Sequence, residues 1–207
     1  MRSYIAALLS AVALADTSGK TKPSGGYNYN EGGENWGAYY PDMENNICGL
    51  ATSKEQSPID LPTDSGYLKD DKDMDIKVEG LGENAVESLD YETANHEVNW
   101  HFNFGSWNES AKVTRTAADT KVETFTPLQI HWHTPSENTV DGKHYAAEAH
   151  LVSQGANGDY AVVGYFFDPD VGNVTNDFVK SFLTGFDERN NADEDTKAKI
   201  DMSLLKN

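Results

Sequence analysis

Three histidines at strand-like spacing are the strongest chemical signal in this sequence of 207 residues. One residue separates His131 from His133, and His150 follows in a second run of alternating character. Successive side chains of a β-strand point to opposite faces, so His131 and His133 share a face. Three neutral imidazoles from neighbouring strands match the ligand set of a catalytic zinc, whose fourth position is left for water. The pattern therefore predicts a zinc site.

Two strands joined by a tight turn must position these histidines. The first run extends from Phe125 to Asn138 and the second from Ala146 to Val152. Between them, Asp141-Gly142 is typical of a two-residue hairpin turn, with Val140 paired to Lys143. Counting outward from that turn predicts that His133 lies opposite His150.

Period-2 alternation also assigns the neighbours of the histidines to faces. Gln129 shares the face of His131, and Glu148 and Val152 share the face of His150. Gln129 and Glu148 are thus expected to accept the second N–H of a ligand histidine and fix its tautomer. The opposite, apolar face is predicted to hold Leu128, Ile130 and Trp132, with Ala147, Ala149 and Leu151 from the second run.

Glu137 suggests a second possible type of metal site. His131-x-His133 followed by Glu137 fits the first half of a cupin motif, in which the glutamate is a ligand and iron or manganese is common. Cupins carry a glycine six residues before the first histidine, where this sequence has Phe125, and no Pro-x-Gly-x-x-His segment follows. The flanking residues therefore favour zinc.

The run from Leu128 to Val152 resembles the zinc site of an alpha-class carbonic anhydrase. Further matching segments, in the family's order, are Glu34-Asn35-Trp36-Gly37, Cys48-Gly49, Gln56-Ser57-Pro58-Ile59-Asp60 and the stretch from Ala161 to Phe166. The resemblance covers about Tyr27 to Asn207. It implies an α+β, β-dominated fold: a single domain with a large twisted, mostly antiparallel sheet and short surface helices. It also implies zinc-dependent hydration of carbon dioxide to bicarbonate, a small-molecule substrate.

The resemblance assigns further roles. His131, His133 and His150 would hold Zn²⁺, and Val152 and Val162 would form the apolar wall against which carbon dioxide lies. His96 falls where the family's proton-shuttle histidine stands, and Asn99 where a cavity asparagine stands. His101 shares strand parity with Asn99 and is the alternative shuttle. Glu137 matches a glutamate that does not bind zinc but accepts a hydrogen bond from a threonine hydroxyl.

The sequence departs from the family in one region. Secreted members pair the cysteine equivalent to Cys48 with another after a Thr-Thr-Pro-Pro segment, and that segment is absent here, as is any second cysteine. We therefore expect the family's last strands to be missing from this chain. A catalytically silent, carbonic anhydrase-related binding or matrix protein is the alternative function. Such members typically lose zinc histidines, whereas all three are present.

The remaining signals concern chain organisation. Residues 1–15 read as a secretory signal peptide, 16–26 as a flexible lead-in and 27–207 as the carbonic anhydrase-like domain, so secretion is expected. No other run is long enough to cross a bilayer. A net charge of −18 argues against nucleic acid as a partner. We expect a monomer, with one helix from Asn176 to about Phe186.

Overall fold

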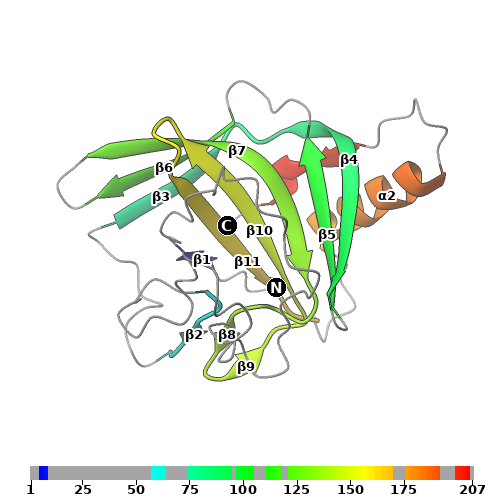
Figure 1. Cartoon of the computed structure of the whole chain (residues 1–207), viewed down its shortest axis with the longest axis horizontal. Coiled ribbons are helices and arrows are strands. Elements are labelled where there is room, and N and C mark those ends of the chain that lie inside the picture. Colours follow the sequence, from blue (N-terminus) through cyan, green and yellow to red (C-terminus); the bar gives the residue numbers. More distant parts are fainter. Residues whose placement is uncertain are drawn as a thin grey trace, which may run out of the picture.

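A large antiparallel sheet dominates the computed structural model, which describes residues 5–8, 57–63, 74–94, 97–104, 111–117, 121–169, 176–191 and 199–205 (Figure 1). Seven of its nine strands lie in the order β1-β11-β10-β7-β5-β4-β12, and β6 joins β3 to β7. The bounds are β1 Ile5–Leu8, β3 Met74–Glu79, β4 Glu83–Ala94, β5 Glu97–Phe104, β6 Lys112–Ala117, β7 Val122–His133, β10 Ala147–Gly155, β11 Tyr160–Phe167 and β12 Lys199–Asp201. The expectation of a strand-rich domain built on one large antiparallel sheet is confirmed.

Strand β7 is the centre of this sheet. From Phe125 to His133 it pairs with β10 on one side, while its other side pairs first with β6 and then, from Gln129 to Trp132, with β5. A β-bulge separates these two halves: Val152 is opposite Gln129 and Ser153 is opposite Pro127, so Leu128 has no partner across the ladder. The bulge changes the alternation of faces.

The bulge corrects one sequence-based assignment. Leu128 was expected on the apolar face with Ile130 and Trp132, but its side chain is 39% exposed. Because one extra residue is inserted, Phe125 and Pro127 reach the buried face before the bulge, and Ile130 and Trp132 reach it after the bulge. Unbroken period-2 counting along β7 is therefore wrong at Leu128.

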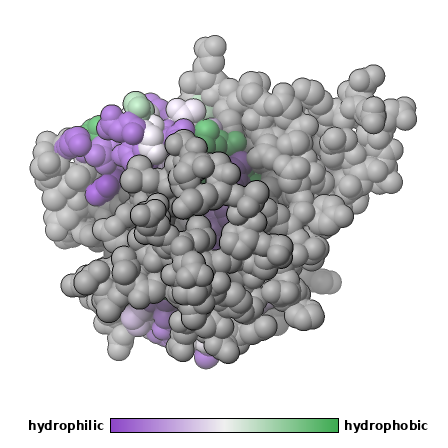
Figure 2. Space-filling model, in the orientation of Figure 1, coloured by the Kyte–Doolittle hydropathy of each residue, from purple (hydrophilic) through white to green (hydrophobic). Residues whose placement is uncertain are grey.

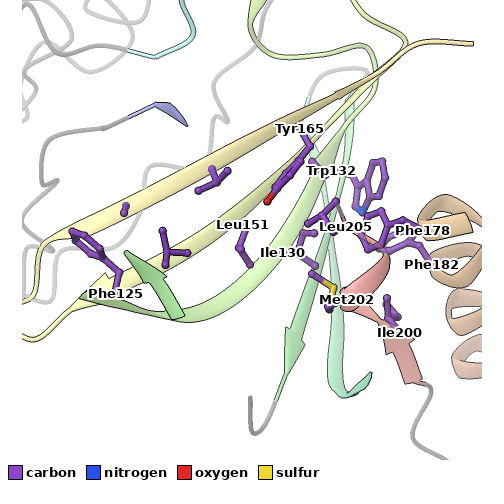
Figure 3. Close-up of a cluster of buried hydrophobic side chains, with 14 residues drawn as sticks. Phe125, Ile130, Trp132, Leu151, Tyr165, Phe178, Phe182, Ile200, Met202 and Leu205 are labelled. Atoms are coloured by element: carbon purple, nitrogen blue, oxygen red, sulfur yellow. The ribbon is translucent and has the colours of Figure 1, made fainter. Parts of the chain in front are cut away.

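The hydrophobic core runs along one face of the sheet, and helix α2, Asp177–Asn191, covers the end of it that holds Trp132 (Figure 3). Trp132 is its organising residue, with ring centroids 4.7 Å from Phe182, 4.8 Å from Phe167 and 5.9 Å from Phe178. Ile200 and Met202 come from β12 and the 3₁₀ helix Met202–Leu204 and close the end of the cluster. The face that carries Ile130 and Trp132 is thus buried, which leaves the opposite face for chemistry.

Helix α2 starts where the sequence predicts. The Asn176 side chain caps it by accepting a hydrogen bond of 3.0 Å from the Val179 N–H. The helix ends at Asn191 rather than near Phe186, because neither proline nor glycine interrupts the polar residues that follow the apolar pattern. Within the part of the chain that the structure covers, no helix has the length and apolar character needed to span a bilayer.

The hairpin turn is confirmed, but the register between β7 and β10 differs from the prediction. Val140 pairs with Lys143 in the short strands β8 (Thr139–Val140) and β9 (Lys143–His144), and Asp141 and Gly142 both have positive φ. Further out, His150 is opposite His131, and His133 is opposite Glu148. The expected pairing of His133 with His150 is therefore wrong by two residues.

The cause of this shift is an unequal pair of loop arms. Five residues, Thr134 to Asn138, separate β7 from β8, whereas three residues separate His144 from Glu148. The longer arm turns inward, so that Asn138 and Ser136 are fully buried. Strand β8 also pairs in parallel with β2, Asp60–Leu61, which ties this loop to a segment almost eighty residues earlier.

Polar side chains cover the end of the sheet formed by β3, β6 and the start of β7 (Figure 2). Lys112 pairs with Glu79 at 3.5 Å, and Glu123 contacts both Arg115 at 3.3 Å and Lys121 at 2.9 Å. Exposed pairs of this kind contribute little to stability, so this surface serves solvation.

Some of the predicted features lie in or beside parts of the chain that the structure does not describe. β1 lies within the predicted signal peptide and pairs antiparallel with β11. The lead-in of residues 16–26, Cys48 and the proposed shuttle His96 lie outside the residues that the structure describes.

Candidate metal centre

Three imidazole rings converge on the sheet face opposite the core. His131 and His133 come from β7, and His150 comes from β10, where it faces His131 across the ladder. The ring centroids are 5.0 Å apart for His131–His133 and His131–His150, and 4.8 Å apart for His133–His150. His150 Nδ1 is 3.2 Å from His131 Nε2. One ring nitrogen of each residue lies within 4.8 Å of the others, a grouping that can hold a metal ion.

The nitrogens that face away from this grouping have carbonyl and carboxylate neighbours. Gln129 Oε1 is 3.0 Å from His131 Nδ1, and Glu148 Oε1 is 2.9 Å from His150 Nε2. Each acceptor oxygen favours a proton on the nitrogen that it contacts. The other nitrogen of the same neutral ring then keeps its lone pair for a metal.

Glu148 is the anchor of a buried polar network. Its carboxylate accepts hydrogen bonds from the Asn138 backbone N–H at 2.9 Å and from Asn138 Nδ2 at 2.8 Å, one on each oxygen. Asn138 Oδ1 in turn accepts the Ile59 N–H at 2.8 Å. Burial by itself raises the pKa of Glu148, but the contact with His150 and the two Asn138 donors outweigh it and lower that pKa. The carboxylate is therefore held ionised and fixed beside His150.

The sequence reasoning assigned no role to Asn138 or Ser136. Ser136 Oγ donates to the Asn138 carbonyl at 2.6 Å and accepts the Tyr145 N–H at 2.8 Å, so it shapes the loop that carries Asn138. Only their position between the two predicted strands could have pointed to these residues. Their hydrogen bonds depend on the inward turn of the loop, which the sequence does not show.

Glu137 lies beside the histidines. Its Oε2 atom is 3.9 Å from His133 Nε2 and 3.9 Å from His150 Nδ1. Glu137 was expected beside the zinc ligands, and these two distances give its position relative to their ring nitrogens.

Two residues predicted to form the substrate pocket, Val152 and Val162, lie on the same face of the sheet. Val152 is two residues after His150 and is opposite Val162 of β11, and both are half-buried. In the backbone ladder, His101 of β5 is opposite His131. His144 is exposed, and its Nδ1 is 2.6 Å from the Ser136 carbonyl oxygen.

The donor set fits zinc. A tetrahedral ion with bonds of about 2.0–2.1 Å to nitrogen separates its donor atoms by about 3.3 Å, and the His150 Nδ1–His131 Nε2 distance is 3.2 Å. Imidazole donors suit zinc among the divalent ions. His131, His133 and His150 are the residues that would hold it.

Comparison with known proteins identifies the family. The family model of eukaryotic-type carbonic anhydrase matches residues 31–206, which include all three histidines. The chain belongs to the alpha carbonic anhydrase family. An Arabidopsis thaliana relative, alpha carbonic anhydrase 5, is 31% identical over 163 residues, covering 77% of this chain and 53% of the relative. A carbonic anhydrase from Klebsiella pneumoniae is 48% identical over 67 residues, covering 31% of this chain and 27% of that protein.

The fold comparison agrees with this membership. A halotolerant carbonic anhydrase from Dunaliella salina superimposes with a TM-score of 0.55 at 20% identity, covering 90% of this chain and 74% of that one. The chain spans about half the length of the first curated relative, 53%. The carbonic anhydrase family thus accounts for the sheet and for the histidine grouping.

Proposed function

We propose that this chain is a zinc-dependent carbonic anhydrase that interconverts carbon dioxide and water with bicarbonate and a proton. The observation that carries the proposal is the grouping of His131, His133 and His150 on the polar face of a carbonic anhydrase sheet. A zinc ion at such a site supplies Lewis acidity that makes water nucleophilic near neutral pH, for which carbonic anhydrase is the standard example.

The chain's own residues prepare the site for this chemistry. Gln129 and Glu148 hold the ring of His131 and His150 in the tautomer that presents a lone pair to the metal position. Val152 and Val162 offer apolar surface on the same face, suited to an uncharged, non-polar substrate. Carbon dioxide fits this surface better than the charged bicarbonate product, which favours release after hydration.

Proton removal requires a group that titrates near neutral pH within or beside the site. We assign this role to His96, with Asn99 lining the pocket, and keep His101 as the alternative because its backbone position is opposite His131. We also propose that the protein is exported, because its first fifteen residues contain an apolar run that ends in small residues, as in a secretory signal peptide.

The test is carbon dioxide hydration by the purified chain with zinc content measured on the same sample. His133→Ala should lose zinc and reduce hydration by more than about 100-fold, whereas His144→Ala, an exposed histidine of the same hairpin region, should keep both. Normal zinc content in His133→Ala would contradict the ligand assignment. Stoichiometric zinc without hydration in the unmodified chain would favour the silent binding protein instead.

A further inference from the structure

A segment far from the histidines in the sequence holds the loop that reaches them. Strand β2 pairs in parallel with β8, in a small sheet of three strands (Figure 1). Ile59, the residue before β2, contacts two consecutive residues of the loop: its N–H donates to Asn138 Oδ1 at 2.8 Å, and its carbonyl accepts the Thr139 N–H at 3.1 Å. Ile59 therefore fixes Asn138 through its side chain and through the peptide that follows it.

Asp60 and Thr63 hold the same hairpin at its turn. Asp60 Oδ1 accepts the Thr139 hydroxyl and the Gly142 N–H, each at 2.8 Å. The Thr63 N–H and hydroxyl donate to the two carboxylate oxygens of Asp141, each at 2.8 Å. These exposed hydrogen bonds replace bonds to water and contribute little singly, but together they attach the segment to the hairpin at several points.

Apolar contacts bring the segment next to Glu148. Leu61 of β2 and Phe166 of β11 form a small buried cluster, separate from the main core. Phe166 is opposite Glu148 across the ladder between β10 and β11, and directly opposite residues point to the same face of a sheet. The segment is therefore packed beside the carboxylate that contacts His150.

The orientation of the Asn138 amide links this segment to the metal centre. Asn138 Nδ2 donates to Glu148 Oε1, the oxygen that is 2.9 Å from His150 Nε2. An ionised carboxylate accepts hydrogen bonds and cannot donate one, so a flipped amide would set its oxygen against Glu148. The Ile59 N–H opposes this flip, because it would then face the amide NH₂ group instead of an acceptor. Ile59 thus decides which end of Asn138 faces Glu148.

We propose that residues 59–63 position the metal centre: they hold the Asn138 amide so that Glu148 stays beside His150. Attachment of this segment and binding of the metal then favour each other, and each raises the equilibrium constant of the other by the same factor. The inference goes beyond the proposed function but rests on the same three histidines. Asp60 is a positioning residue in this scheme, because its carboxylate bonds to the hairpin and acts on His150 only through other residues.

Zinc affinity, measured by competition with a chromophoric chelator, tests the coupling in Asp60→Ala. We expect an affinity at least about threefold below that of the wild type, a smaller loss than in Asn138→Ala because the effect is indirect. In the Asn138→Ala background, Asp60→Ala should lower affinity by less than about 1.5-fold, because the link through the amide is already lost. Asp159→Ala removes the same charge from the turn between β10 and β11 and should match the wild type.

Two results would overturn the proposal. One is an unchanged zinc affinity in Asp60→Ala. The other is an equal loss of affinity in the wild-type and Asn138→Ala backgrounds, because Asp60 would then act on the metal by a route that bypasses Asn138.

Amide hydrogen exchange of the wild type, with and without zinc, covers the case in which Asp60→Ala fails to fold. Zinc should slow exchange of the Ile59 and Thr63 amides at least about threefold, as the reciprocal of the affinity change. The Gly155 amide, bonded to the Asp159 carbonyl at 2.8 Å at the other end of β10, should keep its rate. Equal slowing of all three amides, or an unchanged rate at Ile59, would contradict the proposal.

None of these measurements depends on turnover. Zinc binding without carbon dioxide hydration would count against the proposed function alone, whereas a chain that binds no zinc would overturn both.

Discussion

Replacing Asn138 with alanine tests how far the buried network controls the metal centre. The change removes the bond of 2.8 Å from Asn138 Nδ2 to Glu148 Oε1 and the bond of 2.8 Å from the Ile59 N–H to Asn138 Oδ1. A hydrogen bond to a charged acceptor contributes about 1.5–3 kcal/mol, and an orphaned polar group costs about 1–3 kcal/mol. We therefore expect the free energy of unfolding to fall by about 3–5 kcal/mol.

The same change should weaken zinc binding. Glu148 Oε1, which loses a donor, is also the atom 2.9 Å from His150 Nε2, so its position beside that ring becomes less defined. Loss of a residue that directly orients a ligand histidine typically costs about 10–100-fold in metal affinity. Because the Asn138 backbone N–H still binds Glu148 Oε2, we expect the lower end of that range, about tenfold.

Urea unfolding of the metal-free chain and chelator competition with the zinc-loaded chain measure the two effects separately. Ser136→Ala is the matched control, since Ser136 is equally buried in the same loop but its hydroxyl bonds to the Asn138 carbonyl and the Tyr145 N–H rather than to Glu148. It should lower stability without a comparable loss of zinc affinity. Equal zinc affinities in Asn138→Ala and Ser136→Ala would refute the reasoning, because the network would then support the loop alone.

Three further predictions concern stability. Burial raises the pKa of Tyr165, whose hydroxyl has no hydrogen-bond partner among the described residues, so above about pH 10 only the unfolded state ionises and stability falls as pH rises. Tyr165→Phe should remove that alkaline loss and add about 1 kcal/mol at neutral pH in denaturant titrations. The backbone N–H and the hydroxyl of Thr63 donate hydrogen bonds to the Asp141 carboxylate and lower its pKa. The contact therefore stabilises the folded chain at pH values above the ordinary pKa of the carboxyl group, and this stabilisation is lost on acidification. Asp141→Asn should make the melting temperature less dependent on pH on the acid side. Phe178→Ala should cost about 3–5 kcal/mol, and Leu183→Ala, 54% exposed on the same helix, under about 1 kcal/mol by thermal unfolding.

Local patterns predicted the features that depend on neighbours in the sequence. The His131-x-His133 spacing sets both rings on one face, and Asn176 marks the start of helix α2 through its own side chain. These assignments need only the period of a strand or the geometry of a cap. The family resemblance implied one large, mostly antiparallel sheet, and the order of its strands was not predicted.

Features that depend on distant contacts were predicted wrongly or not at all. His150 pairs with His131 because the loop from Thr134 to Asn138 turns inward, where Asn138 meets both Glu148 and Ile59. The bulge at Leu128 arises where β7 passes from pairing with β6 to pairing with β5. Neither partner strand can be identified from the residues of β7 itself, so continuous counting fails there.

The bulge at Leu128 also separates the metal-binding half of β7 from its other half. Deleting this one residue would give the strand unbroken alternation, and Gln129 to His133 could keep their places opposite β10. Thr126 and Pro127 could keep their partners as well, and plain alternation would still place Phe125 and Pro127 on the buried face with Ile130 and Trp132. Leu128 is thus an insertion that a strand of this kind can hold without moving its neighbours to the other face, and a chain that lacks this residue should keep both the metal motif and the core while losing the local twist that the bulge adds.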